Sequence, residues 1–446
     1  MAVNNSDRMG TAPVASLMWK TSIPLMLSLL VNSLYNLVDS IFVARISEEA
    51  LTALSIAAPV QMLIGALGLG MAVGLNAAVS KALGERDRDE VRNIASASML
   101  MAVVCWLLLS VLYVFIAEPY FRWLSGGNAQ IAAYGKDYLS ICMLCSLGCM
   151  GQWVFDRMLI ATGRSVGFLI TLSTASVTNL ILDPVFIFGF DMGTQGAAIA
   201  TVIGQFAGAV CGYFYNRRFN IEIPLHFSLR PKLRCVGSIL RVGIPTTVMQ
   251  ILVSVMGIAV NTILSGFSAT AVAVSGLCIK LQNFVLIGPR GINNGLIPLI
   301  AYNYGAKKKE RIYACLRWAV LDGFAFMAVI LLLLELLPVP ILRLFDASEQ
   351  MMAMGIPAIR LLAISWFGCV FGLSMGAAFQ ALGKGTYSLI LTITRQVILL
   401  LPLLLISAGL DSLPLVWLSY TVVELLALPV GIYLWRRIRR EIVERI

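Results

Sequence analysis

Long apolar segments separated by short polar connections run through almost the whole chain. Each segment is about as long as the roughly 20 apolar residues that an α-helix needs to cross a bilayer. None shows the apolar–polar alternation that is typical of membrane β-strands. The segments cover approximately residues 16–43, 50–80, 95–117, 131–155, 165–190, 194–216, 237–265, 271–302, 314–338, 353–380, 386–409 and 412–435. This pattern predicts an all-α integral membrane protein with twelve transmembrane helices.

The composition agrees with a surface that faces lipid. Of the 446 residues, 59% are apolar and only 13% are charged, about half the usual charged share of a soluble protein. A soluble enzyme, a secreted disulfide scaffold and a disordered protein are all disfavoured. Although 33 Lys and Arg outnumber 23 Asp and Glu, no basic stripe is interleaved with aromatic residues, so we expect no nucleic-acid partner.

Several chemical motifs are missing from the sequence. No Gly-x-x-x-x-Gly-Lys-Ser/Thr loop occurs, which argues against ATP as the direct energy source. No haem, flavin or nucleophile motif stands out, so we expect neither an enzyme nor a cofactor. The only histidine, His226, lies in a loop far from the helically spaced Cys142, Cys145 and Cys149. We therefore expect no metal site of Cys and His, and interpret these cysteines as small packing residues.

The distribution of basic residues predicts the orientation in the membrane. Most Lys and Arg, Arg157 among them, fall on the side that carries both termini. The other side carries only Arg45, Arg122, Lys136, Arg343 and Arg360. Since cytoplasmic loops are enriched in Lys and Arg, we expect both termini to be cytoplasmic. The chain would then be a multi-pass protein of the plasma (inner) membrane of a prokaryote.

The two halves of the chain repeat each other. A shift of 221 residues places Ile23-Pro24 on Ile244-Pro245, Gly84 on Gly305 and Arg122 on Arg343, and a later shift of 220 places Gly163 on Gly383, Thr174 on Thr394 and Thr201 on Thr421. We predict an N-lobe (1–220), a basic cytoplasmic linker (221–235) and a C-lobe (236–446). Each repeat has six helices, so the two pseudo-symmetric six-helix bundles would be related by an axis along the membrane normal and enclose a cleft. This is a transporter architecture.

Polar and acidic residues lie at helical spacing inside three apolar segments of the first half. They are Asn32, Tyr35, Asn36 and Asp39 in the first segment, Asn179 and Asp183 in the fifth, and Thr201 and Gln205 in the sixth. Ionisable groups at this depth are costly and usually functional. The counterparts of Asp39 and Asp183 in the second half are Val260 and Leu403. The acidic pair is therefore not a packing requirement of the repeat.

Two carboxyl groups that converge in a poorly solvated cavity cannot easily both be ionised. Such a pair retains a proton or binds a cation. We predict an ion- or proton-coupling site formed by Asp39, Asp183, Asn179 and Thr201, with Tyr35 beside it, which could take Na⁺ or H⁺. The alternative is that these groups only hydrogen-bond the helices together. Pro24, on the same first helix, is either a hinge or a static kink.

The second half carries a different polar set. We predict a substrate cavity lined by Asn32, Asn36, Gln205, Gln250, Gln282, Asn283 and Arg290. Snorkelling to the membrane surface is the alternative for Lys280 and Arg290. Asp322, Glu335 and Glu424 lie near segment ends or have no evident partner in the sequence.

Five motifs in this order are shared with a known family. They are Ile23-Pro24, the stretch from Tyr35 to Arg45 (YNLVDSIFVAR), Ala161-Thr162-Gly163-Arg164, Asn179 through Asp183-Pro184, and Tyr302 through Ala306 (YNYGA). Over essentially its whole length the chain resembles the multidrug and toxic compound extrusion (MATE) family of the MOP flippase superfamily.

The resemblance implies antiport of small cationic amphipathic molecules out of the cell in exchange for H⁺ or Na⁺, by rocking of two lobes. It also implies that the ion site of the family falls on Asp39, Asn179, Asp183, Thr201 and Tyr35. We expect a monomer surrounded by membrane lipids. A lipid-linked oligosaccharide flippase of the same superfamily remains the alternative, since Lys280, Arg290 and Arg395 would suit a basic cavity. A channel or sensor would be a different class, and it would dissipate ion gradients rather than use them.

Overall fold

The computed structural model describes residues 5–125 and 128–446. Within them, ten helices are long and apolar enough to cross a membrane, and two bent helix pairs raise the number of candidate spans to 12. The described residues contain no strand. The predicted all-α membrane fold is confirmed.

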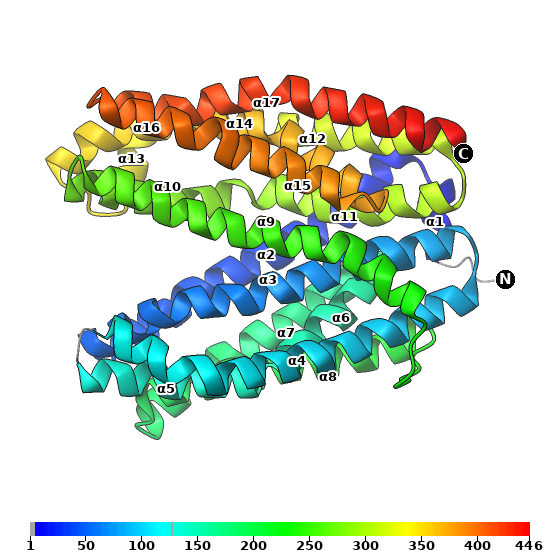
Figure 1. The fold of residues 1–446 in the computed structure, drawn as a ribbon, viewed down its shortest axis with the longest axis horizontal. Helices are drawn as coiled ribbons and strands as arrows, with labels where there is room; N and C mark the ends of the chain where they lie inside the picture. Colours follow the sequence, from blue (N-terminus) through cyan, green and yellow to red (C-terminus); the bar gives the residue numbers. More distant parts are fainter. Residues whose placement is uncertain (1–4, 126–127) are drawn as a thin grey trace.

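The elements of the first half form the lower bundle in Figure 1, except α1, which lies against the upper bundle. They are α1 (Asp7–Thr11), α2 (Val14–Ala44), α3 (Glu48–Gly84), α4 (Arg88–Leu124), α5 (Ala129–Leu144), α6 (Leu147–Ala161), α7 (Ser165–Pro184), the π-helix η1 (Val185–Gly189) and α8 (Gly193–Phe219). Side chains before several spans cap the first turn, as preferred at helix N-termini. For example, Ser47 accepts a hydrogen bond from the amide of Ala50 at 3.0 Å.

The elements of the second half form the upper bundle. They are α9 (Leu233–Ser265), α10 (Ala269–Val285), α11 (Ile287–Gly305), α12 (Lys309–Leu336), α13 (Pro338–Arg343), α14 (Glu349–Ala381), α15 (Gly385–Ile393), the π-helix η2 (Thr394–Leu400), α16 (Leu401–Gly409), α17 (Leu413–Glu441) and the 3₁₀ turn η3 (Val443–Arg445). The connection between the bundles covers 220–232 and contains neither helix nor strand.

Two of the predicted spans are bent and two contain a π-helix. The fourth span bends by 46° between α5 and α6, and the eighth by 47° between α10 and α11. The fifth continues from α7 into η1, and the eleventh contains η2. In the eighth span Gly288 and Pro289 follow the bend directly, and proline is a usual cause of such a break. π-Helical turns often mark functional positions.

The two bundles meet through contacts that repeat the internal symmetry. A Cβ atom on Gly70 of α3 would lie 2.0 Å from Oγ1 of Thr247, and one on Gly291 would lie 2.5 Å from the side chain of Met26. Gly291 and Met26 lie 221 residues from Gly70 and Thr247, so the two contacts are equivalent. Gly84 and Gly305, which are also equivalent, leave no room for a Cβ between α3 and α11. These paired contacts are those of two repeats around one pseudo-twofold axis.

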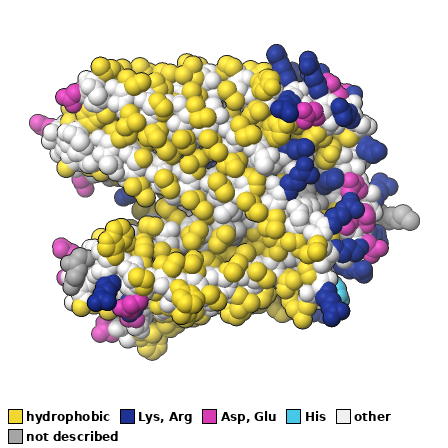
Figure 2. All heavy atoms as spheres, in the orientation of Figure 1, with side chains coloured by type: hydrophobic (Ala, Val, Ile, Leu, Met, Phe, Trp, Pro, Cys, Tyr) yellow, Lys and Arg dark blue, Asp and Glu magenta, His cyan; other side chains and the backbone are white. Residues whose placement is uncertain are grey.

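The bundles are closed at one end and separated at the other. Figure 2 shows the molecule hollowed between the bundles at the end opposite to the one where most Lys and Arg gather. We call the latter the basic end. The Gly84–Gly305 contact lies toward this end, because Gly84 is the last residue of α3 and Gly305 the last residue of α11, and both helices end there. The shape is that of a transporter whose cleft opens away from the basic end.

Candidate functional site

Three helices of the N-lobe bring the predicted coupling residues together. Asn179 of α7 donates hydrogen bonds from Nδ2 to Oγ1 of Thr201 on α8 at 3.2 Å and to Oδ1 of Asp183 at 3.4 Å. Asp183 is fully buried and Asn179 is 2% exposed. From α2, Asp39 lies close to Asp183, and Tyr35 lies close to Thr201. The five residues therefore form one cluster.

Pro184 fixes the position of Asp183 in the span. Proline has no N–H to donate and crowds the carbonyl of the preceding turn, so regular α-helical bonding stops here. The chain continues as η1, in which the amide of Phe190 donates to the carbonyl of Val185 at 2.9 Å. Asp183 thus lies at the junction between an α-helix and a π-helix.

Gly204 allows α7 and α8 to approach closely enough for the Asn179–Thr201 contact. A Cβ at this position would lie 2.7 Å from the carbonyl oxygen of Ala175 and 3.0 Å from Cβ of Asn179. Real Cβ atoms almost never show the first distance. Thr201 lies three residues before Gly204 on the same helix face, so the missing side chain sets its distance to Asn179.

Two acceptor oxygens in this cluster have no hydrogen-bond partner among the described residues. They are Oδ1 of Asn179 and Oδ2 of Asp183. A buried polar group without a partner costs free energy, and a positive species that reached these acceptors would remove that cost. A proton shared with Asp39, or a Na⁺ ion held by carboxylate, amide and hydroxyl oxygens, fits this donor set.

The polar cluster extends to residues that the sequence analysis missed. Tyr138 of α5 is buried near Tyr35 and Asp39, and its hydroxyl accepts a hydrogen bond from Nε2 of Gln61 on α3 at 2.6 Å. Both residues lie within apolar segments, so their polar side chains could have marked them in the sequence as candidate site residues. Tyr138 and Gln61 form a second layer of hydrogen-bonding groups behind the ion site.

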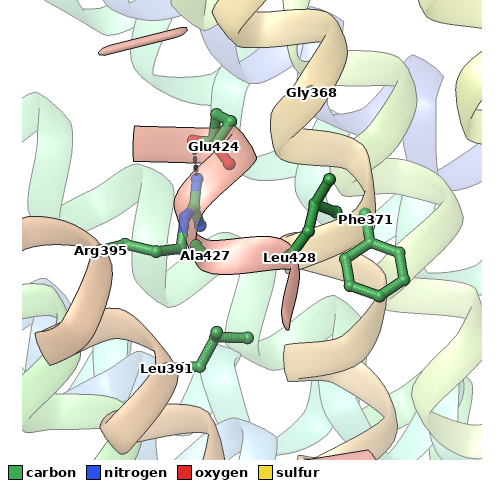
Figure 3. A pocket seen from close by; sticks show the side chains of 8 residues that line it. Gly368, Phe371, Leu391, Arg395, Glu424, Ala427 and Leu428 are labelled. Carbon is green, nitrogen blue, oxygen red and sulfur yellow. Dashed lines mark hydrogen bonds and ion pairs between the residues drawn. The ribbon is translucent and has the colours of Figure 1, made fainter. Parts of the chain in front are cut away.

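The C-lobe contains an ion pair that the sequence did not predict. Arg395 on η2 donates to the carboxylate of Glu424 on α17 (Figure 3). Their side chains are only 16% and 12% exposed. Gly368 and Gly372 on α14 leave room for them, since a Cβ on Gly372 would lie 3.1 Å from the guanidinium of Arg395. No partner of Glu424 was evident in the sequence, because the two residues are 29 positions apart on different helices.

Arg157, one of the basic residues assigned to the side of both termini, is buried in the structure. Helix α6 runs to Ala161, beyond the predicted end of the segment, so Arg157 lies inside it and is 4% exposed. Its guanidinium donates to Oδ1 of Asn294 on α11 at 3.1 Å and lies over the ring of Trp153. The hydrogen bond joins the two lobes. The neighbouring Asp156 is also buried and accepts from Oγ1 of Thr171 at 2.5 Å.

The predicted substrate cavity is only partly assembled by hydrogen bonds. Arg290 donates to Asn283 at 3.5 Å, and both side chains are exposed. Asn36 donates to the carbonyl of Asn32 within α2 at 2.7 Å. Gln205, Gln250 and Gln282 remain predictions as cavity residues. Pro24 lies within an unbroken α2, where its carbonyl accepts from Ser28.

The first described residues, 5–12, connect the two lobes at the basic end. On the N-lobe side, the amide of Asn5 donates to Glu222 at 2.7 Å and its side chain donates to the carbonyls of Thr162 and Gly163. On the C-lobe side, the residues that bind this segment are Tyr302, Asn303, Lys308 and Arg311. We call residues 5–12 the strap. It holds the lobes together where the cleft is closed.

Comparisons with known proteins agree with this architecture. The family model MatE matches residues 24–185 and again residues 245–406, once in each half. The multidrug export protein MepA of Staphylococcus saprophyticus is 24% identical over 399 residues, which cover 89% of this chain and 88% of the relative. MepA of Staphylococcus aureus is 23% identical over 411 residues, with 91% and 90% covered.

Solved structures share the whole fold. A MOP superfamily transporter from Pyrococcus furiosus superposes with a TM-score of 0.92 at 24% identity, covering 100% of this chain and 99% of the other. A multidrug resistance MATE family transporter in an outward-facing conformation superposes with a TM-score of 0.92 at 23% identity, covering 98% of each chain. At these identities the likeness shows the fold.

Proposed function

The chain belongs to the MatE family of membrane transporters and is not an enzyme, and from this premise we propose that it exports small cationic amphipathic compounds. The energy comes from antiport of H⁺ or Na⁺. The similarity to MepA multidrug export proteins along nine-tenths of the chain supports a range of exported compounds.

One observation carries the coupling proposal. The unpartnered acceptors of Asn179 and Asp183 lie beside Thr201 and close to Asp39. A proton or Na⁺ entering this cluster neutralises charge and satisfies an unpartnered oxygen, so it stabilises the arrangement of α2 against α7 and α8. A ligand shifts a conformational equilibrium only if it binds one state better than the other. Ion binding at the junction of these three helices meets that condition if the helices move during transport.

The closed basic end supports alternating access by rocking of the lobes. The Gly84–Gly305 contact, the Arg157–Asn294 hydrogen bond and the strap all join the lobes there. All three must be broken for the cleft to open at that end. The enrichment of Lys and Arg at this end supports a cytoplasmic location for it, with both termini inside and the present shape open to the outside. Pro24 would act as the hinge of α2.

The flippase alternative is weakened by the C-lobe ion pair. Three basic residues supported a basic cavity, but Arg395 is neutralised by Glu424. Arg290 and Lys280 remain. The acidic cluster of the N-lobe is better suited to a cationic substrate than to the anionic phosphates of a lipid-linked sugar.

Transport by the purified protein in proteoliposomes tests the proposal. An inward or outward gradient of H⁺ or Na⁺ is imposed separately, and movement of ethidium across the bilayer is followed by fluorescence. We expect uphill movement driven by one of the two gradients. Ethidium movement that only equilibrates, whatever ion gradient is imposed, would contradict antiport and favour a channel.

A further inference from the structure

The connection between the lobes has an alternating pattern that the transport proposal leaves unexplained. From Phe219 to Arg230 apolar and polar residues alternate. The one polar position without a polar side chain is Pro224. Ile223 is 2% exposed and packs with Leu225 on the N-lobe core. Phe227 and Leu229, by contrast, are 50% and 75% exposed. An aqueous loop would not be expected to present large apolar side chains to water in this way.

Beside these apolar side chains lies an open cleft of about 220 Å³ with a polar and basic lining. It is formed between the first turns of α4 and the connection. Arg92 and Asn93 contribute from α4, and His226, Ser228 and Arg230 from the connection. The cleft lies at the basic end, where the single histidine is visible at the edge of the molecule (Figure 2).

Hydrogen bonds fix the wall of the cleft. The amide of Ser228 donates to Oγ of the buried Ser96 at 3.0 Å, and the amide of Arg230 donates to Oγ of Ser228 at 3.2 Å. These bonds hold the connection against α4, so the arginines of the two elements face one cleft. Arg92 also pairs with Asp89 at 3.2 Å, but both side chains are at least half exposed. Such exposed pairs contribute little, so an anionic ligand can compete with Asp89 for Arg92.

We propose that this cleft binds the phosphate of an anionic phospholipid from the leaflet at the basic end. Arg92 and Arg230 supply charge-assisted hydrogen bonds, for which guanidinium groups are well shaped, and Asn93 and His226 add further polar contacts. The exposed side chains of Phe227 and Leu229 enter the interfacial region beside the lipid. These apolar side chains favour a lipid over free phosphate, because free phosphate has no apolar part that they could contact.

Native mass spectrometry of the full-length protein in detergent tests this assignment. Phosphatidylglycerol, phosphatidylcholine and inorganic phosphate are titrated separately. We expect phosphatidylglycerol to be retained at least tenfold more tightly than phosphatidylcholine. Arg92→Gln combined with Arg230→Gln should weaken phosphatidylglycerol binding at least tenfold. The matched control, Arg436→Gln with Arg440→Gln, removes the same charge from exposed positions on α17 and should change binding less than twofold.

A second variant separates the two sources of phosphate. Phe227→Ser with Leu229→Ser leaves both arginines in place and should weaken phosphatidylglycerol binding severalfold. Equal losses in the α17 control would overturn the site, since binding would then follow net charge. Inorganic phosphate binding as tightly as the lipid, or an unchanged affinity in the Phe227 and Leu229 variant, would overturn the assignment to a lipid.

Discussion

The fifth and sixth spans of the N-lobe and the eleventh and twelfth of the C-lobe are equivalent in the repeat, yet their chemistry is opposite. With the shift of 220 residues, Arg395 corresponds to Ala175 and Glu424 to Gly204. In the N-lobe, Ala175 and Gly204 bring α7 and α8 into close contact. In the C-lobe, the same two positions carry a buried ion pair. Conversely, Asn179 and Asp183 correspond to Leu399 and Leu403.

The difference shows that the same backbone fold can carry an open polar cluster in one lobe and a closed ion pair in the other. The N-lobe cluster has acceptor oxygens left open, so a proton or cation can enter and leave. In the C-lobe the carboxylate of Glu424 already has its cation in Arg395. An ion arriving there would have to displace a covalently attached guanidinium. We therefore propose that ion coupling belongs to the N-lobe and that the C-lobe pair has a structural role.

The largest effect is expected from Asp183→Asn. The amide keeps the size of the side chain but cannot take up a proton or offer a negative oxygen, so ion-driven ethidium transport in proteoliposomes should fall by about 100-fold, the upper part of the usual range of coupling free energies. Asp39→Asn should act alike. Thermal unfolding should be unchanged within a few degrees. Wild-type pumping by both variants would show that coupling lies elsewhere.

The C-lobe pair should behave as a structural unit. Arg395→Ala leaves Glu424 buried without its partner and should lower the free energy of unfolding by about 3–5 kcal/mol, as measured by unfolding in SDS. Arg395→Ala combined with Glu424→Gly restores the residues found at the equivalent N-lobe positions. We expect this double variant to be more stable than either single variant and to retain coupled transport. Loss of coupling in a folded double variant would assign the C-lobe pair to the ion pathway.

Gly204→Ala should disturb the close packing of α8 against α7 in the N-lobe. Its Cβ would lie 2.7 Å from the backbone of α7, and overpacking of this kind costs about 1–3 kcal/mol. Coupling should weaken as well, because Thr201 moves away from Asn179. The control is Gly257→Ala, where nothing lies within 4 Å of the added atom. If both variants unfold and transport alike, the close approach of α7 and α8 is unimportant.

The smallest effect on transport is expected at the interface between the lobes. Asn294→Leu removes the partner of Arg157, and a hydrogen bond to a charged group is worth about 1.5–3 kcal/mol. The population of the state open at the basic end should rise. Electron spin distances between labels at Gln130 and Glu349, introduced as unnatural amino acids because the chain has nine cysteines, would become shorter. An unchanged distance distribution would mean that this bond does not hold the lobes.

The sequence predicted the spans, the repeat and the N-lobe cluster for physical reasons. Apolar length marks a span, and the spacing of Asn179 and Asp183 places both on one helix face. The Arg395–Glu424 pair could not be predicted, because pairing across two spans depends on their rotation about their own axes. The burial of Arg157 and its bond to Asn294 could not be predicted either, because they depend on how the two lobes meet. The strap also gave no signal, as its bonds are made largely by its own backbone amides and carbonyls.

Proton release on substrate binding tests the central claim most directly. Purified protein in weakly buffered detergent solution is mixed with ethidium while the pH is recorded, and a parallel sample measures displacement of ethidium by Na⁺. We predict that the wild-type protein and the Arg395→Ala, Glu424→Gly double variant release protons or respond to Na⁺, and that Asp183→Asn does neither although it still binds ethidium. The same proton release or Na⁺ response from Asp183→Asn as from the wild-type protein would contradict an N-lobe ion site.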